Sequence, residues 1–213
     1  MADGDIAVPG AEISDPPGDI HNAYPELPVL DYVHCAVAMT DVVAYMAKSA
    51  STLVVKRAAY VVFNNESGAG QSGINNNFIG LQADGDRHPE KYTPLFNGTC
   101  LHQESMTGNW RRFVCFKTWQ GSADVMCGEV ADRGLYVGGF AHPYANMQIN
   151  TVDDWPLAYY REWVEGSSTV SIPDADKRDL LQQYQAATGH FPSGIWQNVL
   201  SFGRKMFSGD PGT

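Results

Sequence analysis

Apolar residues recur at helical spacing in the first third of the chain. Between residues 32 and 46 they lie three or four positions apart, and Asp31 precedes them as a suitable N-cap. The positions are Tyr32, Cys35, Met39, Val42, Val43 and Met46. A second periodic run begins at about Ser51, and Gly68 should end it near Glu66, because glycine readily adopts the left-handed conformation at helix C-termini. Two helices are therefore predicted.

The pattern changes after the second helix. From residue 67 to about 97 the chain is rich in Gly, Asn and Asp, which predicts a structured loop with at most short helical turns. A β-hairpin is then expected, with arms "GTCLHQES" (98–105) and "WRRFVCFKTW" (110–119) joined by the turn-forming "MTGN". No other part of the sequence gives a strong β signal.

The remainder of the chain predicts further helices. Ser122 is a good N-cap for a helix through about Asp132, which Gly134 should close. Thr151 and Asp154 resemble a capping box at the start of the next helix. Two more helices are expected, one from Pro173 and Asp174 to a stop at Gly189, and one from about Gly194 to Phe207.

The N-terminal region has a different composition. Five prolines lie among the first 28 residues together with scattered Asp and Gly, and this composition favours an extended arm over a helix. We expect residues 1–28 to form a flexible N-terminal arm and residues 29–213 to form one domain. The predicted fold class is mainly α (α+β), a single domain with one small β-hairpin lobe.

Charge and hydropathy exclude several classes of partner. With 24 acidic and 14 basic residues the net charge is −10, so the surface repels phosphate backbones and anionic lipid headgroups. No run of 18 uncharged apolar residues is present, so we expect no membrane span. The start "MADGDIAVPG" lacks the features of a secretory signal. We therefore expect a chain that stays in the cytoplasm or is exported without a cleaved signal peptide.

Four cysteines, Cys35, Cys100, Cys115 and Cys127, include no CxxC pair, which argues against a zinc site. Two interpretations remain open. The cysteines are buried free thiols, or at least one disulfide forms in an oxidising compartment. Four cysteines allow three pairings, and the sequence does not choose among them.

The segment "FNNESGAGQSGINNNF" (63–78) contains a single acid, Glu66. At the end of the second predicted helix, the unpaired carbonyls form a negative pole, and Phe63 reduces hydration. Both effects raise the pKa of a carboxyl group, as a general acid at neutral pH requires. The alternative is a frayed helix end with a solvated glutamate.

The residues after Glu66 suggest sugar binding. Amide side chains both donate and accept hydrogen bonds, so they suit sugar hydroxyl and N-acetyl groups, although they are also common in turns. Glycosidic hydrolysis usually needs a second carboxylate, and the candidates are Asp84, Asp86 and Glu104. Glu104 stands at the tip of the predicted hairpin, where a solvated side chain is the alternative. Phe78 and Tyr136 are the preferred aromatics for stacking on sugar rings.

The order of these segments resembles glycoside hydrolase family 73, peptidoglycan N-acetylglucosaminidases with a lysozyme-like fold. That family typically reads Glu-Ser-Gly, then Asn-Asn-Leu-Phe-Gly-Ile-Lys, and later Phe-Arg-x-Tyr-x-Ser. Here Glu66-Ser67-Gly68 matches the first motif. "NNNFIGLQ" matches the second with one extra residue and Gln82 for Lys, and "FKTWQGSAD" matches the third with Trp119 for Tyr. The resemblance covers roughly residues 50–140 and implies a lysozyme-like domain.

The resemblance also implies roles for individual residues. Glu66 would be the general acid, Glu104 would match the mobile second carboxylate, and Tyr136 would match an active-site tyrosine. The substrate-binding candidates are Asn77, Phe78, Gln82, Asp84 and Tyr136. No cofactor or metal is expected. The implied reaction is cleavage of the β-1,4 glycan backbone of peptidoglycan, as an N-acetylglucosaminidase or, alternatively, a muramidase.

A chain of this kind further resembles the glycoside hydrolase effectors of type VI secretion, which act in the periplasm of a rival cell. This implies three partners: peptidoglycan strands, the type VI secretion apparatus, and a periplasmic immunity protein that occludes the active site. It also implies export without a cleaved signal peptide. The alternatives are a phage-encoded cell-wall lysin and a noncatalytic glycan-binding module.

Overall fold

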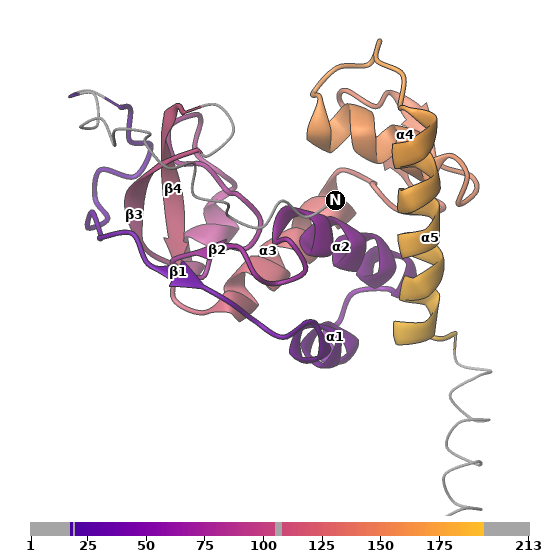
Figure 1. Ribbon diagram of the computed structural model, residues 1–213, viewed down its shortest axis with the longest axis horizontal. Helices are drawn as coiled ribbons and strands as arrows, with labels where there is room; N and C mark the ends of the chain where they lie inside the picture. The colour runs from indigo at the N-terminus through magenta and orange to yellow at the C-terminus, as the bar shows by residue number, and fades with distance from the viewer. Residues whose placement is uncertain (1–17, 19, 105–107, 194–213) are drawn as a thin grey trace, which may run out of the picture. The chain divides into compact units, whose positions relative to one another are not determined.

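The computed structural model describes residues 18, 20–104 and 108–193 of the chain (Figure 1). Helices alternate with three small antiparallel sheets of two strands each in this part, so the fold is α+β, as the sequence predicts. Among the described residues, no helix combines the length and the apolar character needed to cross a membrane.

The contacts of the chain divide into two compact units, whereas the sequence predicts one domain over residues 29–213. Unit 1 contains the residues up to Val42 together with Val62–Met126. Unit 2 contains Val43–Val61 together with the residues from Cys127 onward. Each unit is described by itself below.

The first helix begins later than the sequence predicts. α1 spans Met39–Lys48, and the chain before it is extended because β1 (His34–Cys35) pairs with β2 (Gly73–Ile74). The side chain of Asn75 supports this pairing by accepting a hydrogen bond from the backbone N–H of Val33 at 2.7 Å. Long-range pairing therefore overrides the helical spacing of the apolar residues in this segment.

The second helix agrees with the prediction. α2 spans Leu53–Glu66, and Gly68 follows it with a φ of +53° in the left-handed region. The loop predicted from residue 67 to about 97 contains only short elements, β2 and the 3-10 helix η1 (Glu90–Leu95). The local signals of a periodic run and a terminating glycine are sufficient to predict this part of the chain.

The predicted hairpin is present in unit 1. β3 (Phe96–Gln103) and β4 (Trp110–Phe116) are antiparallel neighbours, with an irregularity in register just after Phe96 (Figure 1). A parallel bridge between Val29 and Thr99 adds the N-terminal segment to the other edge of β3. The hairpin therefore carries a short third extended segment that the sequence pattern does not predict.

The described part of the predicted N-terminal arm packs into unit 1. Tyr24 is fully buried, and its ring meets Phe96 edge to face with centroids 5.4 Å apart. Burial of this aromatic side chain offsets the entropy lost when the segment is ordered. Residues 20–28 therefore differ from the flexible arm predicted for residues 1–28. Residues 1–17 and 19 lie outside the described part.

α3 spans Trp119–Asp132, so it ends as predicted but begins before Ser122. Ser122 is not an N-cap. Its buried hydroxyl donates a hydrogen bond to the carbonyl of Asn76 and accepts one from the backbone N–H of Phe78 at 3.3 Å. The hydroxyl joins α3 to the asparagine-rich loop, a long-range role that a local capping pattern does not reveal.

Unit 2 is built around Trp155. This residue is fully buried, its indole N–H donates to the carbonyl of Leu135 at 3.2 Å, and its ring centroid lies 5.2 Å from those of Tyr159 and Tyr184. These contacts join α4 (Trp155–Tyr159) to α5 (Asp174–His190) and to Leu135. The other elements of the unit after α3 are β5 (Phe140–Ala141), β6 (Met147–Gln148) and the π-helical turn η2 (Tyr160–Val164).

The helix ends of unit 2 follow the predicted signals only in part. The carboxylate of Asp154 accepts a hydrogen bond from the backbone N–H of Thr151 at 2.9 Å, which is one half of a capping box. α5 begins after Pro173, as predicted, but continues through Gly189 to its end at His190.

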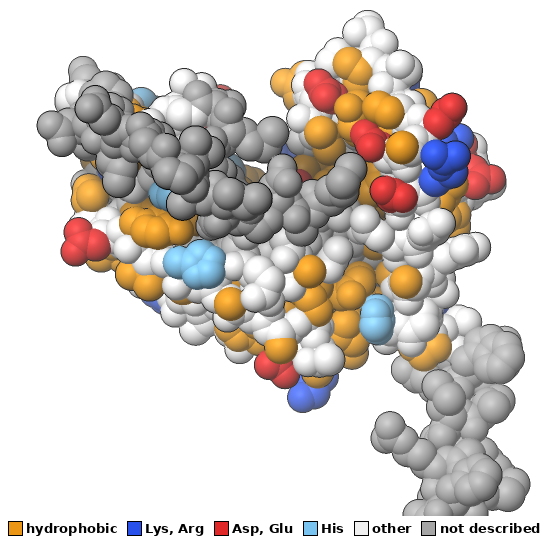
Figure 2. All heavy atoms as spheres, in the orientation of Figure 1, with side chains coloured by type: hydrophobic (Ala, Val, Ile, Leu, Met, Phe, Trp, Pro, Cys, Tyr) orange, Lys and Arg blue, Asp and Glu red, His pale blue; other side chains and the backbone are white. Residues whose placement is uncertain are grey.

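Figure 2 shows acidic side chains gathered over α4 and α5. The helix predicted over residues 194–207 lies outside the described residues.

Candidate functional site

Glu66 is the last residue of α2, and the residues after it fix the end of the helix. The hydroxyl of Ser67 donates to the carbonyl of Phe63 at 2.6 Å and accepts from the backbone N–H of Gly70 at 2.8 Å. Residues 68–70 all have positive φ values. The chain therefore turns sharply directly after the carboxylate, as the Gly-Ala-Gly sequence permits.

The carboxylate of Glu66 lies beside the backbone of Gly80. A Cβ atom built on Gly80 would be 3.9 Å from Oε2 of Glu66, and apart from Gly80 and its two neighbours in the chain no other described atom lies within 4 Å. Gly80 is exposed and has a φ of +63°, whereas Glu66 is half-buried. Position 80 is therefore exposed and has no side chain that could cover the half-buried carboxylate of Glu66.

Asn77 is a structural residue of the loop, whereas the sequence predicts a substrate contact. Its side chain is buried. Its amide nitrogen donates to the carbonyls of Leu81 at 2.8 Å and Val114 at 2.9 Å, and its oxygen accepts from the backbone N–H groups of Ile79 and Leu81. All of these bonds are internal, so the side chain shapes the loop that carries Gly80.

Phe78 also differs from the prediction. Its side chain is 1% exposed and stacks on Phe63, with ring centroids 5.8 Å apart and planes inclined by 23°. Phe63 belongs to the last turns of α2, so this contact fixes the loop against the helix that ends at Glu66. A ring buried in this way packs the loop against the end of α2 and is not exposed for stacking on a sugar ring.

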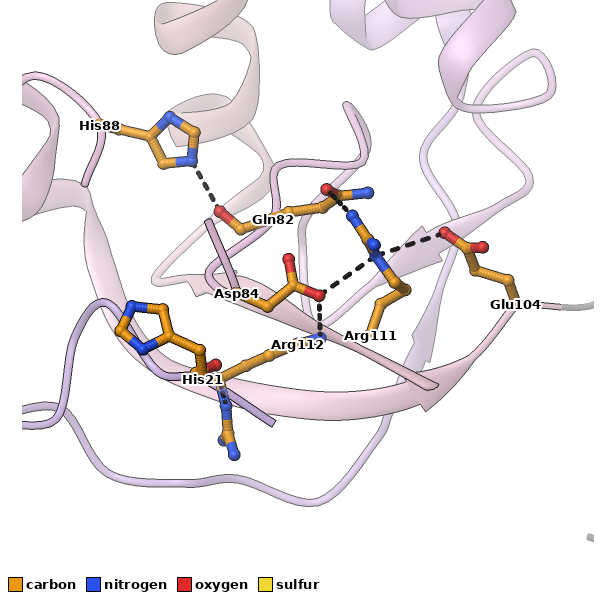
Figure 3. A network of polar contacts seen from close by, with 7 residues as sticks. All are labelled: His21, Gln82, Asp84, His88, Glu104, Arg111 and Arg112. Carbon is orange, nitrogen blue, oxygen red and sulfur yellow. Dashed lines mark hydrogen bonds and ion pairs between the residues drawn. The ribbon is translucent and has the colours of Figure 1, made fainter. Parts of the chain in front are cut away.

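Three of the predicted site residues meet at one arginine that the sequence analysis does not single out (Figure 3). Nε of Arg111 lies 3.1 Å from Oδ2 of Asp84 and 3.8 Å from Oε1 of Glu104. Its Nη2 donates a hydrogen bond to the side-chain oxygen of Gln82. We call these four residues the Arg111 cluster. Glu104 directly follows β3, at the tip of the hairpin as predicted.

The two acids of the Arg111 cluster differ in the exposure of their side chains and in their distance from the guanidinium group. The side chain of Asp84 is 11% exposed, and its Oδ2 also accepts a hydrogen bond from the backbone N–H of Arg112 at 3.3 Å. The side chain of Glu104 is 31% exposed and lies farther from the guanidinium group. Glu104 is therefore the more accessible of the two carboxylates.

The neighbouring arginine explains why one strand carries two basic residues in succession. Side chains of adjacent strand residues point to opposite faces of a sheet. Arg112 is buried, and its guanidinium group donates to the carbonyls of Ile20 and His21 and to the hydroxyl of Thr99, at 3.3 to 3.4 Å. Two adjacent arginines inside an apolar strand were a signal that the sequence offered. One of them has to lie on the buried face and needs polar partners there, and the other lies on the opposite face, where it can bind acids.

His88 lines a pocket of about 660 Å³ in unit 1. Nε2 of His88 lies 2.7 Å from the backbone oxygen of Gln82 (Figure 3). The hydrogen bond from Arg87 holds the pKa of the Glu26 carboxyl below its ordinary value. The described residues that line the pocket are Glu26, Arg87, His88, Glu90, Thr93 and Pro94. None of the predicted catalytic residues is among them.

Two other predicted positions lie apart from these contacts. Tyr136 follows α3 and belongs to unit 2, where its backbone N–H donates to the carbonyl of Gly134 at 2.9 Å. Its side chain is half-buried. Asp86, a candidate for the second acid, is exposed in the loop after Asp84. Unit 1 therefore contains every predicted site residue except Tyr136.

Comparison of the chain with protein-family models, with curated proteins and with solved structures gave no match. Among the described residues, no three His, Cys, Asp or Glu side chains come together in a way that could hold a metal ion. Within the described residues, Glu66 and the Arg111 cluster therefore form the candidate functional site.

Proposed function

We propose that this protein is a glycoside hydrolase that cleaves the β-1,4 backbone of peptidoglycan, with Glu66 protonating the leaving glycosidic oxygen. A lysozyme-like domain and N-acetylglucosaminidase specificity are parts of this proposal. The observation that carries it is the position of Glu66, half-buried at the end of α2 with Oε2 beside the exposed Gly80. A general acid needs partial shielding to retain its proton and an open side from which substrate can approach.

Glu104 is the better candidate for the second carboxylate, which would act on water or on the oxocarbenium ion. Asp84 has an ion pair at 3.1 Å and a backbone hydrogen bond, so it would lose both if it moved toward a substrate. Glu104 is more exposed, and its contact with Arg111 is longer, at 3.8 Å. In this proposal Arg111 places Glu104, and Asp84 and Gln82 hold Arg111.

The substitution Glu66→Gln tests the proposal. It retains the shape of the side chain but removes the acidic proton, so the rate of lysis should fall by on the order of 10²-fold or more. The measurement is the loss of turbidity of outer-membrane-permeabilised cells, with thermal unfolding of both proteins to show that the variant is folded. Equal lysis by both proteins would exclude Glu66 from the mechanism. If neither lyses cells, a noncatalytic glycan-binding module is favoured.

We also propose that the enzyme acts in the periplasm as a type VI secreted antibacterial effector. The support is the sequence resemblance, together with the acidic composition that argues against nucleic-acid targets. Expression in a host should be toxic when the chain is directed to the periplasm and harmless in the cytoplasm. Rescue by an adjacently encoded periplasmic protein would support an effector with its immunity protein, and an adjacent holin would support a phage lysin.

A further inference from the structure

Two cysteines are diagonal neighbours inside the β3–β4 hairpin. Cys115 pairs with Gly98, and Cys100 lies two residues further along β3, so both cysteines point to the same face. The residue opposite Cys115 has no side chain, and Cys100 and Cys115 belong to the same buried cluster. Among the four cysteines, these two are therefore placed to react with each other.

The pair is sealed inside unit 1. Both cysteines are fully buried and form one apolar cluster with Phe113, against which Leu30 packs. The side chain of Leu30 packs against Gly98, since a Cβ atom built on Gly98 would lie 2.7 Å from the side chain of Leu30. The backbone N–H of Leu30 donates to the carbonyl of Thr99 at 2.8 Å and anchors this cover. An external oxidant reaches the thiols only before this segment docks or when it opens.

We propose that Cys100 and Cys115 form an intramolecular disulfide when the chain folds in an oxidising compartment. Both thiols lose a proton, one S–S bond forms, and two electrons pass to a disulfide oxidant such as oxidised glutathione, which is reduced to two thiols. Contact with Cys115 and the charge of Arg112 lower the pKa of the Cys100 thiol in the folded protein. This modification site does not depend on the proposed enzymatic activity.

The burial of the pair predicts when the bond forms. Refolding from the reduced, unfolded chain in a glutathione redox buffer should yield the disulfide, because the hairpin can form while the thiols are still accessible. The reduced, folded protein should oxidise much more slowly. Cys35, which is half-buried and near the surface, should be the first of the four thiols to react with a maleimide in that state.

Peptide mapping tests the pairing directly. Trypsin places the four cysteines on four different peptides, residues 1–48, 92–111, 113–117 and 118–133. After oxidative refolding and alkylation, mass spectrometry should find peptides 92–111 and 113–117 joined. Alkylation of all four cysteines, or a dominant linkage that contains Cys35 or Cys127, would overturn the proposal.

Two variants control the experiment. Cys35→Ser should retain the linked peptides, whereas Cys115→Ala should lose them. In the wild type the oxidised form should melt roughly 5 to 10 °C above the reduced form, as expected for closing a loop of about 15 residues. This difference should vanish in Cys115→Ala. If that variant does not fold, the wild-type map decides alone, and an unchanged melting temperature on oxidation counts against the proposed bond.

Discussion

Each unit contains an arginine that bridges two acids, but the two clusters differ in the accessibility of those acids. In unit 2, Arg133 lies 3.0 Å from Glu162, whose side chain is completely buried. In unit 1, Arg111 lies 3.8 Å from Glu104, whose side chain is 31% exposed. The arginine side chains are similarly exposed, at 34% and 37%. The difference between the clusters therefore comes from the acids.

The buried acid of unit 2 has a structural role. The carboxylate of Glu162 accepts hydrogen bonds from the backbone N–H groups of Tyr144 and Ala145, at 2.8 and 3.1 Å, and from Arg133. It thereby fixes the loop between β5 and β6. The same combination of residues can thus stabilise a loop or hold an acid where solvent and substrate can reach it. Burial distinguishes the two cases, and sequence composition does not.

The largest effect should come from breaking the unit 2 cluster. Glu162→Ala leaves two backbone donors without their acceptor and removes one of the two acids that bind Arg133, so the free energy of unfolding should fall by about 3 kcal/mol or more. Chemical denaturation measures this. The matched control is Glu129→Ala, which removes the i,i+4 partner of the same arginine and should cost less, because no described backbone donor bonds to Glu129. Equal losses in the two variants would contradict the structural role of Glu162.

The corresponding change in unit 1 should affect activity more than stability. Glu104→Gln should lower the rate of peptidoglycan cleavage about tenfold or more, equivalent to about 1.4 kcal/mol in the barrier, with little change in melting temperature. Asp84→Asn should lower both activity and stability, because Asp84 also binds the backbone of β4. The control is Asp31→Asn, an exposed acid of the same unit. A stability loss in Glu104→Gln as large as that in Glu162→Ala would remove the contrast between the units.

The smallest effect should be the acid sensitivity of the start of α4. Hydrogen bonds from Thr151 and Asn150 hold the pKa of the Asp154 carboxyl below its ordinary value of 3.8. Because the pKa is lower in the folded protein than in the unfolded chain, ionisation of this carboxyl group stabilises the folded state at pH values above the ordinary pKa. This stabilisation is lost as the pH falls through the lower pKa of the folded state. Wild type should therefore lose more stability than Asp154→Asn between about pH 5 and pH 2. Identical pH profiles would show that these hydrogen bonds do not stabilise the helix.

Local signals in the sequence predicted the helix end and the hairpin that carry the candidate site. The end of α2 near Glu66 followed from a periodic run and a glycine, and the hairpin followed from its β-branched and aromatic residues. The position of Glu104 at the hairpin tip followed from the same pattern. These features depend on interactions between residues close in the chain, so their sequence signals are strong.

The features that the sequence did not reveal depend on long-range contacts. Ser122 has the side chain of an N-cap but bonds to a loop more than 40 residues away. Asn77 has a side chain suited to sugars but uses it inside its own loop. Arg111 became part of the site through strand pairing, which places it against Gln82 and Asp84. A residue type offers several partners, and tertiary packing selects one.

In the proposed function, Glu66 acts as the general acid of a peptidoglycan glycosidase. Mass spectrometry of muropeptides released from purified peptidoglycan tests it most directly, with wild type and Glu66→Gln compared at equal folded concentration. We expect soluble products with N-acetylglucosamine at the new reducing end for the wild type, and at least about 10²-fold less product for the variant. Products that retain intact glycan strands, or equal product from both proteins, would contradict it.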